Sequence, residues 1–272
     1  MKVAAIVTVF HPDLKLLSES LNSYQASVDK ILIWKNSKEE ISISDQLAGK
    51  IVFCGTGDNE YMAHPLNYAI HWCLNNGYDY LLTMDQDSVW HNCADFILRV
   101  STVLNDKVAI YAPNVNQLIH REMDYFSVES VITSGSLCNV QIANELGGFR
   151  EDYQIYWVDS EYCCWARKNG YEIVVLPQCH LTQQFGKETK TILGYMAANY
   201  SPAVYYFLIR NMWWMKREYH DNPSWKCILY TTFYYTRGIV LGEKMKLKKL
   251  SMIIKAYRDG IFCSMKKRKC HS

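Results

Sequence analysis

The stretch Tyr80-Leu81-Leu82-Thr83-Met84-Asp85-Gln86-Asp87-Ser88 decides the fold. Its apolar part has no helical period and is bounded by polar residues, so it predicts a short buried strand. Side chains alternate along a strand, and Asp85 and Asp87 therefore point the same way if the extended form continues. Two carboxylates just past the carboxyl end of a buried strand lie where α/β folds bind ligands.

Carboxylate oxygens are hard ligands, and the pair suits Mg²⁺ or Mn²⁺ that also holds a phosphate. An Asp-x-Asp triplet by itself fits a solvated surface turn equally well. The order of the surrounding elements favours the ligand site. Strands are expected at residues 3–10, 30–34, 50–54 and 107–112, the last stopped by Pro113, and a further strand at 171–176 is expected to end at Pro177. Helices are expected over residues 14–24, 62–73 and 96–104.

This alternation predicts a mostly parallel sheet with helices on both faces. The 272 residues allow one large α/β domain with an appendage, and a charged fraction of 21% argues against disorder. We expect a catalytic domain over residues 1–189, with a nucleotide-sugar-binding half at 1–113 and an acceptor half at 114–189. Residues 190–272 are expected to form a helical C-terminal region rich in aromatic and basic side chains.

The formal net charge of +2 conceals an asymmetry. From Arg237 to the end there are eleven of the 29 Lys and Arg residues but only two of the 27 acids, Glu243 and Asp259. A basic tail on an acidic body seeks phosphate, in an anionic lipid, a nucleic acid or a pyrophosphate-bearing substrate. Nucleic acid is the least favoured partner, because no recognised binding module frames the basic residues.

The predicted last helix places Leu247, Leu250, Ile254, Tyr257 and Ile261 on one face, with lysines around it. Such a helix fits peripheral contact of the region 243–269 with an anionic membrane, or docking on the protein's own body with a solvated charged rim. Ten cysteines without a Cys-x-x-Cys pair, and no signal peptide, lead us to expect reduced thiols and a cytoplasmic location. No apolar stretch reaches the roughly 18 to 20 residues that span a bilayer.

A second informative stretch is Tyr156-Trp157-Val158-Asp159-Ser160-Glu161, which leads into a predicted helix. Acids are favoured in a first helical turn by the helix dipole, which accounts for Asp159 without any function. Its apolar neighbours point further, because a partly desolvated carboxylate has a raised proton affinity and can act as a general base.

The order of these motifs resembles glycosyltransferase family 2, the inverting enzymes with the GT-A fold, and in detail its rhamnosyltransferase-like branch. The resemblance runs over nearly the whole chain. It rests on a series of short segments in the family's order: His11-Pro12-Asp13, Asn59 with Ala63, Leu66 and Asn67, residues 82–88, residues 133–137, Gly147-Gly148-Phe149, residues 158–161 with Cys163 and Arg167, Gly170-Tyr171, Tyr205-Tyr206 with Arg210-Asn211, and Arg258-Asp259-Gly260.

The resemblance implies a Rossmann-like α/β fold of the GT-A type and a role for each matched residue. Asp85 and Asp87 match the residues that hold the divalent cation and the nucleotide, and Asp159 matches the base that deprotonates the acceptor hydroxyl. The donor-binding residues implied in this way are Thr8, Val9, Phe10, Lys35, Asn36, Asn59, Asn67, Asp85, Gln86, Ser134 and Gly135.

Two positions depart from the family pattern. Lys35 stands where the family has an Asp that contacts the base, and it could instead contact a phosphate or change the preference for the base. Gln183 stands where the family commonly has a metal-contacting His, which implies either a weaker dependence on metal or a cation held by Asp87, phosphates and water.

The implied activity is transfer of a sugar from a nucleotide-sugar donor to a hydroxyl of a lipid-linked surface polysaccharide or oligosaccharide. The best match is rhamnose or another deoxyhexose from a dTDP donor, and a UDP- or GDP-sugar is the alternative. A non-catalytic GT-A-like scaffold at the membrane is the competing class. A sugar nucleotidyltransferase fits less well, since no Gly-rich basic loop follows the first strand.

Overall fold

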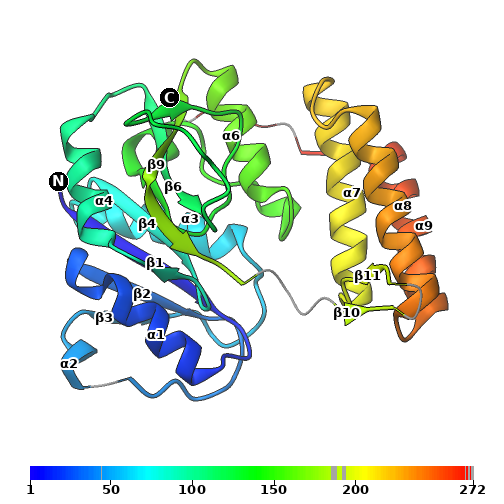
Figure 1. The fold of residues 1–272 in the computed structure, drawn as a ribbon, viewed down its shortest axis with the longest axis horizontal. Helices are drawn as coiled ribbons and strands as arrows, with labels where there is room; N and C mark the ends of the chain where they lie inside the picture. Colours follow the sequence, from blue (N-terminus) through cyan, green and yellow to red (C-terminus); the bar gives the residue numbers. More distant parts are fainter. Residues whose placement is uncertain (44, 185–188, 192–193, 267, 269, 271–272) are drawn as a thin grey trace. The chain divides into compact units, whose positions relative to one another are not determined.

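The computed structural model describes residues 1–43, 45–184, 189–191, 194–266, 268 and 270 (Figure 1). The chain divides into two compact units. The first, which we call the sheet unit, comprises Met1–Glu151, Asp159–Gln184 and Arg268–Ser272, and the second, the helical unit, comprises Asp152–Val158 and Phe185–Lys267. The segment before Asp159 therefore belongs to the helical unit, although it interrupts the sheet unit in sequence.

The sheet unit is built on one large sheet that confirms the α/β prediction. Its first half is parallel, in the order β3 (Ile51–Cys54), β2 (Lys30–Lys35), β1 (Val3–Val9) and β4 (Tyr80–Asp85). Beyond β4 the order is β8 (Ser136–Asn139), β6 (Val108–Val115), β9 (Glu172–Thr182) and β5 (Val89–Trp90), with β7 (Phe126–Ser127) also paired to β9. The pairs β4–β8 and β8–β6 are antiparallel, whereas β6–β9 is parallel.

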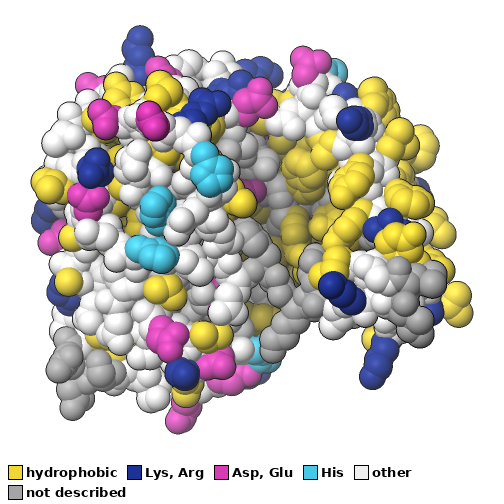
Figure 2. All heavy atoms as spheres, viewed as in Figure 1, with side chains coloured by type: hydrophobic (Ala, Val, Ile, Leu, Met, Phe, Trp, Pro, Cys, Tyr) yellow, Lys and Arg dark blue, Asp and Glu magenta, His cyan; other side chains and the backbone are white. Residues whose placement is uncertain are grey.

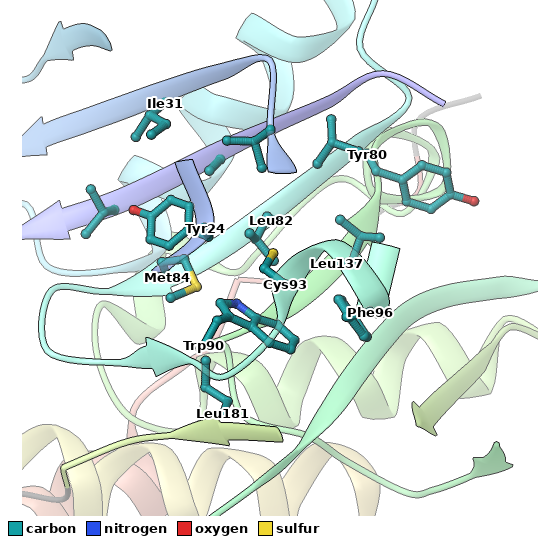
Figure 3. Close-up of a cluster of buried hydrophobic side chains, with 14 of the residues drawn as sticks. Tyr24, Ile31, Tyr80, Leu82, Met84, Trp90, Cys93, Phe96, Leu137 and Leu181 are labelled. Carbon is teal, nitrogen blue, oxygen red and sulfur yellow. The ribbon is translucent and has the colours of Figure 1, made fainter. Parts of the chain in front are cut away.

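Helices cover both faces of this sheet, and its central strands β1, β2 and β4 are buried along nearly their whole length. The helices are α1 (Leu14–Tyr24), α2 (Asp45–Ala48), α3 (Ala63–Asn75), α4 (Cys93–Thr102), α5 (Val140–Glu145) and α6 (Val158–Lys168), with short 3₁₀ turns at Gln25–Ser27 and Glu151–Tyr153. Alternate residues of β1, such as Val3 and Val7, join the cluster that includes Tyr24, Trp90 and Phe96 (Figure 3). The intervening residues Ala4 and Ile6 are equally buried, as expected of a strand packed on both faces.

The two prolines that we predicted to end strands do not do so. β6 runs through Pro113 to Val115, and β9 runs through Pro177 to Thr182. The register between the two strands shifts after Pro113, where Leu176 is its partner and His180 becomes the partner of Asn114. Proline lacks the N–H that a regular ladder needs, and it is tolerated at such irregularities. The extension of β9 brings Gln183 within hydrogen-bond distance of Asp85.

The helical unit contains α7 (Pro202–Tyr219), α8 (Trp225–Gly242) and α9 (Lys246–Phe262), with the short strand pair β10 (Thr189–Lys190) and β11 (Met196–Ala197). Its core joins side chains of all three helices, among them Leu208, Ile239 and Ile253. None of the helices that the structure describes is both long and apolar enough to cross a membrane.

The packing of α9 differs in part from the predicted amphipathic pattern. Its buried face carries Lys249, Ile253, Ala256 and Gly260, while Leu247 and Ile254 of the predicted face are exposed. Lys249, one of the lysines expected around the apolar face, is buried and donates to Glu243 Oε2 at 2.6 Å. The other oxygen of Glu243 accepts from the Tyr205 hydroxyl and from the Asn199 backbone N–H. The buried lysine is therefore paired, as a charge in a protein interior must be.

All ten cysteines lie within the described residues and are free thiols, in agreement with the prediction of reduced cysteines. Seven of them are buried, and these behave as small apolar core residues.

Candidate active site

The site is assembled at the carboxyl ends of three neighbouring parallel strands. Thr8 on β1 pairs in register with Asp85 on β4, and Val9 on β1 pairs with Lys35 on β2. Because parallel strands end at the same edge of a sheet, these predicted donor-binding positions lie side by side. The structure thus brings together residues that are up to about eighty positions apart in the sequence.

Side-chain amides lock the loops at this edge. Gln86 accepts from the backbone N–H of Phe10 at 2.8 Å and donates to the Phe10 carbonyl at 3.1 Å, so it joins the ends of β1 and β4. Asn36 is buried, donates to the Tyr61 carbonyl at 2.7 Å and accepts from the Glu60 N–H at 2.9 Å. These two predicted donor-binding residues hold the shape of the loops through their own hydrogen bonds.

The segment 133–136 passes close to β4, as a wall of the same site. The Asp85 backbone N–H donates to Ser134 Oγ at 3.2 Å, and that hydroxyl donates to Ser88 Oγ at 2.8 Å. Gly135 has a φ of +77°, and a Cβ there would lie 2.9 Å from a Leu181 methyl and 3.0 Å from Pro113. A glycine is needed at this point for backbone conformation and for space.

Three carboxylates converge on this edge of the sheet unit. Burial, reinforced by the negative charges of Asp87 and Asp159, raises the pKa of Asp85 from 3.8 to about 7. Burial also raises the pKa of Asp87 and of Asp159. An influence of Asp159 on Asp85 requires proximity, since screened charges in water interact weakly beyond about 10 Å. Asp159, remote in sequence, therefore lies near enough to Asp85 for their charges to interact.

Asp159 lies in the first turn of α6, as the sequence predicts. The Ser160 backbone N–H donates to its Oδ1 at 2.7 Å. Hydrogen bonds from the backbone favour the charged form and oppose the effect of burial on the pKa of Asp159. The carboxylate is partly buried and held in one orientation, as a general base requires.

Two further predicted donor-binding residues have partners inside the fold. The Asn67 side chain accepts from the Phe149 N–H at 2.7 Å and donates to the Phe149 carbonyl at 2.8 Å. A Cβ on Gly148 would lie only 2.3 Å from Asn67 Oδ1, so this glycine allows the close approach. Asn59 accepts from the Tyr61 N–H at 3.0 Å, which closes a local turn. Any contact of these two residues with a donor stays a prediction.

Gln183 fits a role at the cation site through an unpaired oxygen. Its Nε2 donates to Asp85 Oδ2 at 2.6 Å, while its buried Oε1 has no hydrogen-bond partner. Within the described ranges, no three His, Cys, Asp or Glu side chains are grouped so that they could hold a metal ion by themselves. Two carboxylates and one free amide oxygen nevertheless fit a Mg²⁺ or Mn²⁺ ion that takes its remaining ligands from phosphates and water.

Sequence reasoning missed a buried ion pair on the helix that carries Asp159. Glu161 is fully buried and accepts from Arg268 at 2.8 Å, and the Arg268 guanidinium also donates to the Gly148 carbonyl at 2.5 Å. The basic tail that we read as a surface feature thus supplies one internal counterion. The one feature of the sequence that could have indicated this ion pair is a glutamate at an apolar position of α6.

The chain is similar in sequence to a curated protein and in fold to several solved structures. The chain is 24% identical over 285 residues to the dTDP-rhamnosyl transferase RfbF of Shigella flexneri, covering 95% of both chains. Among solved structures, S. aureus TarS in complex with UDP-GlcNAc matches 97% of this chain and 81% of its own, with a TM-score of 0.61 and 16% identity. The mannosyltransferase PcManGT from Pyrobaculum calidifontis, in complex with GDP-Man and Mn²⁺, matches 97% and 76%, with a TM-score of 0.58 and 13% identity.

No family model matches the chain. The fold is the GT-A fold seen in these solved glycosyltransferases. The chain is similar over nearly its whole length to a curated rhamnosyl transferase.

Crowding of negative charge at Asp85 predicts a measurable effect on stability. Its raised pKa means that the folded state disfavours the charged form, so stability is lost as the pH rises from about 4 to about 7. Without a divalent cation, Asp85→Asn should raise the free energy of unfolding at pH 8 relative to wild type and give no such gain at pH 4. Urea unfolding in EDTA at both pH values measures this. An equal loss of stability at both would contradict it.

Proposed function

We propose that the protein is an inverting glycosyltransferase that moves a sugar from a nucleoside diphosphate donor to a hydroxyl of a glycan acceptor. The observation that carries the proposal is the Asp-x-Asp pair at the carboxyl end of β4, with Asp159 near enough for its charge to act on Asp85. One pair is arranged to hold a cation with a pyrophosphate, and the third carboxylate is arranged to take a proton.

The proposed reaction is a single displacement at the anomeric carbon of the sugar. Asp159 accepts the proton of the acceptor hydroxyl while the acceptor oxygen forms its bond to that carbon. The bond from the carbon to the diphosphate oxygen breaks at the same time, and the nucleoside diphosphate leaves with the electron pair. One base facing the leaving group across the sugar gives inversion, through a transition state with oxocarbenium character as in glycoside hydrolysis.

The negative charge of the departing diphosphate needs compensation. A divalent cation bound by Asp85 and Asp87 would supply it as a Lewis acid. The chain's own part is to present the two carboxylates together, with the Gln183 amide fixed against Asp85. The raised pKa of Asp85 supports this role, because a bound cation would offset both the burial of this carboxylate and the charges of Asp87 and Asp159.

The donor that we propose is a dTDP-deoxyhexose, with rhamnose as the first candidate. Similarity to a dTDP-rhamnosyl transferase over 95% of both chains supports it. UDP- and GDP-sugars are the alternatives, since TarS was solved with UDP-GlcNAc and PcManGT with GDP-Man. Lys35, at the end of β2 beside Val9, is the residue that we expect to influence the choice of base or to contact a phosphate.

Replacement of the proposed base should lower the rate of transfer and leave the affinity for the nucleotide nearly unchanged. Asp159→Asn should lower the rate of transfer by about 10²-fold or more, the usual contribution of a general base. Affinity for the nucleoside diphosphate with Mn²⁺ should change by about twofold at most, because Asp85 and Asp87 remain. Product formation by chromatography and calorimetric titration with the nucleotide measure the two quantities.

The matched control is Asp106→Asn, which neutralises an exposed aspartate at the amino end of β6 in the same unit. It should leave both quantities unchanged. Full transfer activity in Asp159→Asn would overturn the assignment of the base.

Donor choice and cation dependence can be read from thermal stability. A ligand present at a hundred times its Kd stabilises the folded state by about 2.7 kcal/mol. We expect the largest rise in Tm with dTDP and Mn²⁺, a smaller rise with UDP or GDP, and loss of the rise in EDTA. A rise with GDP larger than that with dTDP would exclude the proposed donor, and a rise insensitive to EDTA would exclude the cation.

We further propose that the helical unit contacts an anionic membrane surface, where a lipid-linked acceptor would be available. Helix α8 leaves a stripe of large apolar side chains exposed on one side: Trp225 at 58%, Leu229 at 69%, Phe233 at 63% and Val240 at 46%. Leu247 and Ile254 of α9 are also exposed, at 85% and 71%.

Exposed lysines accompany these apolar side chains. Lys226 lies on α8, and Lys246, Lys248 and Lys255 lie on α9. Figure 2 shows hydrophobic and basic side chains intermingled over this unit. Apolar residues that can enter the headgroup region, together with basic residues that attract anionic lipid, favour a bilayer as the occupant.

Vesicle sedimentation tests the membrane proposal. The protein should bind vesicles that contain phosphatidylglycerol and should not bind pure phosphatidylcholine, and Leu229→Ser with Phe233→Ser should abolish binding. Leu98→Ser is the matched control, because Leu98 on α4 is equally exposed at 64%. Binding that survives the double substitution, or self-association through α8 in place of vesicle binding, would contradict the proposal.

The same measurements distinguish the proposed enzyme from the competing function, a non-catalytic GT-A-like scaffold at the membrane. Vesicle binding without turnover of any nucleotide-sugar would favour the scaffold. The presence of Asp85, Asp87 and Asp159 together favours the enzyme.

A further inference from the structure

Thr83 interrupts the apolar run of β4 with a buried hydroxyl. It lies between Leu82 and Met84, two residues before Asp85, and its exposed fraction is 0%. A buried hydroxyl costs free energy unless it is hydrogen-bonded. The partners of this hydroxyl lie on residues 130–136, which we call the bridging segment.

The Thr83 side chain contacts both ends of a turn in the bridging segment. Its Oγ1 lies 2.5 Å from the Thr133 carbonyl oxygen and 3.0 Å from that of Ser136, and its single proton is shared between these two acceptors. The turn is closed by the Ser136 N–H, which donates to the Thr133 carbonyl at 3.1 Å. Gly135, its third residue, has a φ of +77°, which a turn of type II requires at that position.

Backbone groups of β4 bind the same turn. The Gly135 N–H donates to the Thr83 carbonyl at 2.7 Å, and the Asp85 N–H donates to Ser134 Oγ at 3.2 Å. Beyond the turn, Ser136 pairs with Thr83 in the antiparallel ladder of β4 and β8. The turn is therefore fixed to the strand that carries Asp85, through the main chain and the side chain of Thr83.

The other end of the bridging segment lies against the first turn of α6. Ser130 Oγ donates to Ser160 Oγ at 3.4 Å, and Ser160 directly follows Asp159. Burial raises the pKa of Asp159, and a hydrogen bond from the Thr133 backbone is among the interactions that oppose this rise. The bridging segment thus contacts both elements that carry the proposed functional acids, β4 and α6. All of these residues belong to the sheet unit.

We propose that Thr83 is a positioning residue for glycosyl transfer, whose hydroxyl fixes the bridging segment to β4 and thereby sets the distance between the Asp-x-Asp pair and Asp159. The inference rests on the proposed function, because the roles of these acids belong to that proposal. It assigns Thr83 no contact with the substrate. Its contribution is to the geometry of attack, where displacement by about 1 Å can cost about 10²-fold in rate.

Thr83→Val tests the inference by removing the hydroxyl while keeping a side chain that is branched at Cβ. The carbonyls of Thr133 and Ser136 then lose a donor, and the turn is held less firmly against β4. We expect kcat for transfer to fall by about tenfold or more. The affinity for dTDP with Mn²⁺ should stay within about threefold, because the Asp-x-Asp pair that binds them is unchanged.

Thr83→Ser is the conservative variant that should rescue activity. It restores a hydroxyl that can reach the same carbonyls, but it removes a buried methyl group and should therefore lower the free energy of unfolding. We expect kcat within about threefold of wild type despite this loss of stability. A kcat as low in Thr83→Ser as in Thr83→Val would overturn the inference.

The matched control is Tyr111→Phe, which removes another buried hydroxyl of the sheet unit. The Tyr111 hydroxyl donates to the Val103 carbonyl at 3.2 Å and accepts from the Asn105 N–H at 2.9 Å. These contacts lie at the amino end of β6, which is at the opposite edge of the sheet from the carboxyl end of β4. Tyr111→Phe should leave kcat unchanged. A fall in kcat equal to that in Thr83→Val would make the effect one of general stability and overturn the inference.

Amide hydrogen exchange followed by mass spectrometry tests the same contact without turnover. In Thr83→Val, exchange should accelerate in peptides that cover the bridging segment and stay unchanged in α4. Unchanged exchange in the bridging segment would overturn the inference even in an active enzyme. Faster exchange there, with a wild-type protein that transfers no sugar, would support the hold of Thr83 on the segment and count against the proposed function.

Discussion

Burial of neighbouring carboxylates at one edge of the sheet is the main constraint on this structure. Asp85 lies at the carboxyl end of a buried strand, where burial, reinforced by the charges of Asp87 and Asp159, raises its pKa to about 7. An isolated protein gains nothing from gathering acids in this way, since each one disfavours the ionisation of its neighbours. Under the proposed function, this arrangement would bind a cation and accept a proton from the substrate. The folded protein loses stability because these carboxylates are held close together and away from water.

The fold imposes this crowding by simple means. Parallel pairing of β1 with β2 and β4 brings Thr8, Lys35 and Asp85 to one edge. Hydrogen bonds from Gln86, Asn36 and Ser134 then fix the loops around them. Asp159 lies in the first turn of α6, where the Ser160 backbone N–H donates to its carboxylate.

The sequence predicted the strands of the nucleotide half and the helices α1, α3, α4 and α6, because apolar runs carry their signal locally, whereas α2 and α5 were not predicted. It failed at Pro113 and Pro177, where a shift of register between two strands tolerates the missing N–H. Such a shift depends on the partner strand, so one segment alone cannot reveal it. For the same reason Gln183 was placed by resemblance, and its bond to Asp85 was unforeseen.

The sequence analysis also failed to predict the buried charged residues. Lys249 and Arg268 belong to a basic stretch that reads as solvated, yet each pairs with a buried glutamate, Glu243 and Glu161 respectively. Whether a lysine is exposed or paired is decided by the partner that folding brings to it, and this information is absent from local composition. The left-handed residues at 154, 156 and 157 were likewise invisible, because none of them is glycine.

The most direct test of the central claim is a crystal structure with Mn²⁺ and a nucleoside diphosphate, with the ion located by its anomalous scattering. We predict a peak within coordination distance of the Asp85 and Asp87 carboxylates, with the diphosphate on the ion and the Asp159 carboxylate across the space that a sugar would fill. A diphosphate bound elsewhere, or an ion at these carboxylates with Asp159 turned away from it, would contradict the convergence of the three acids on one reaction centre.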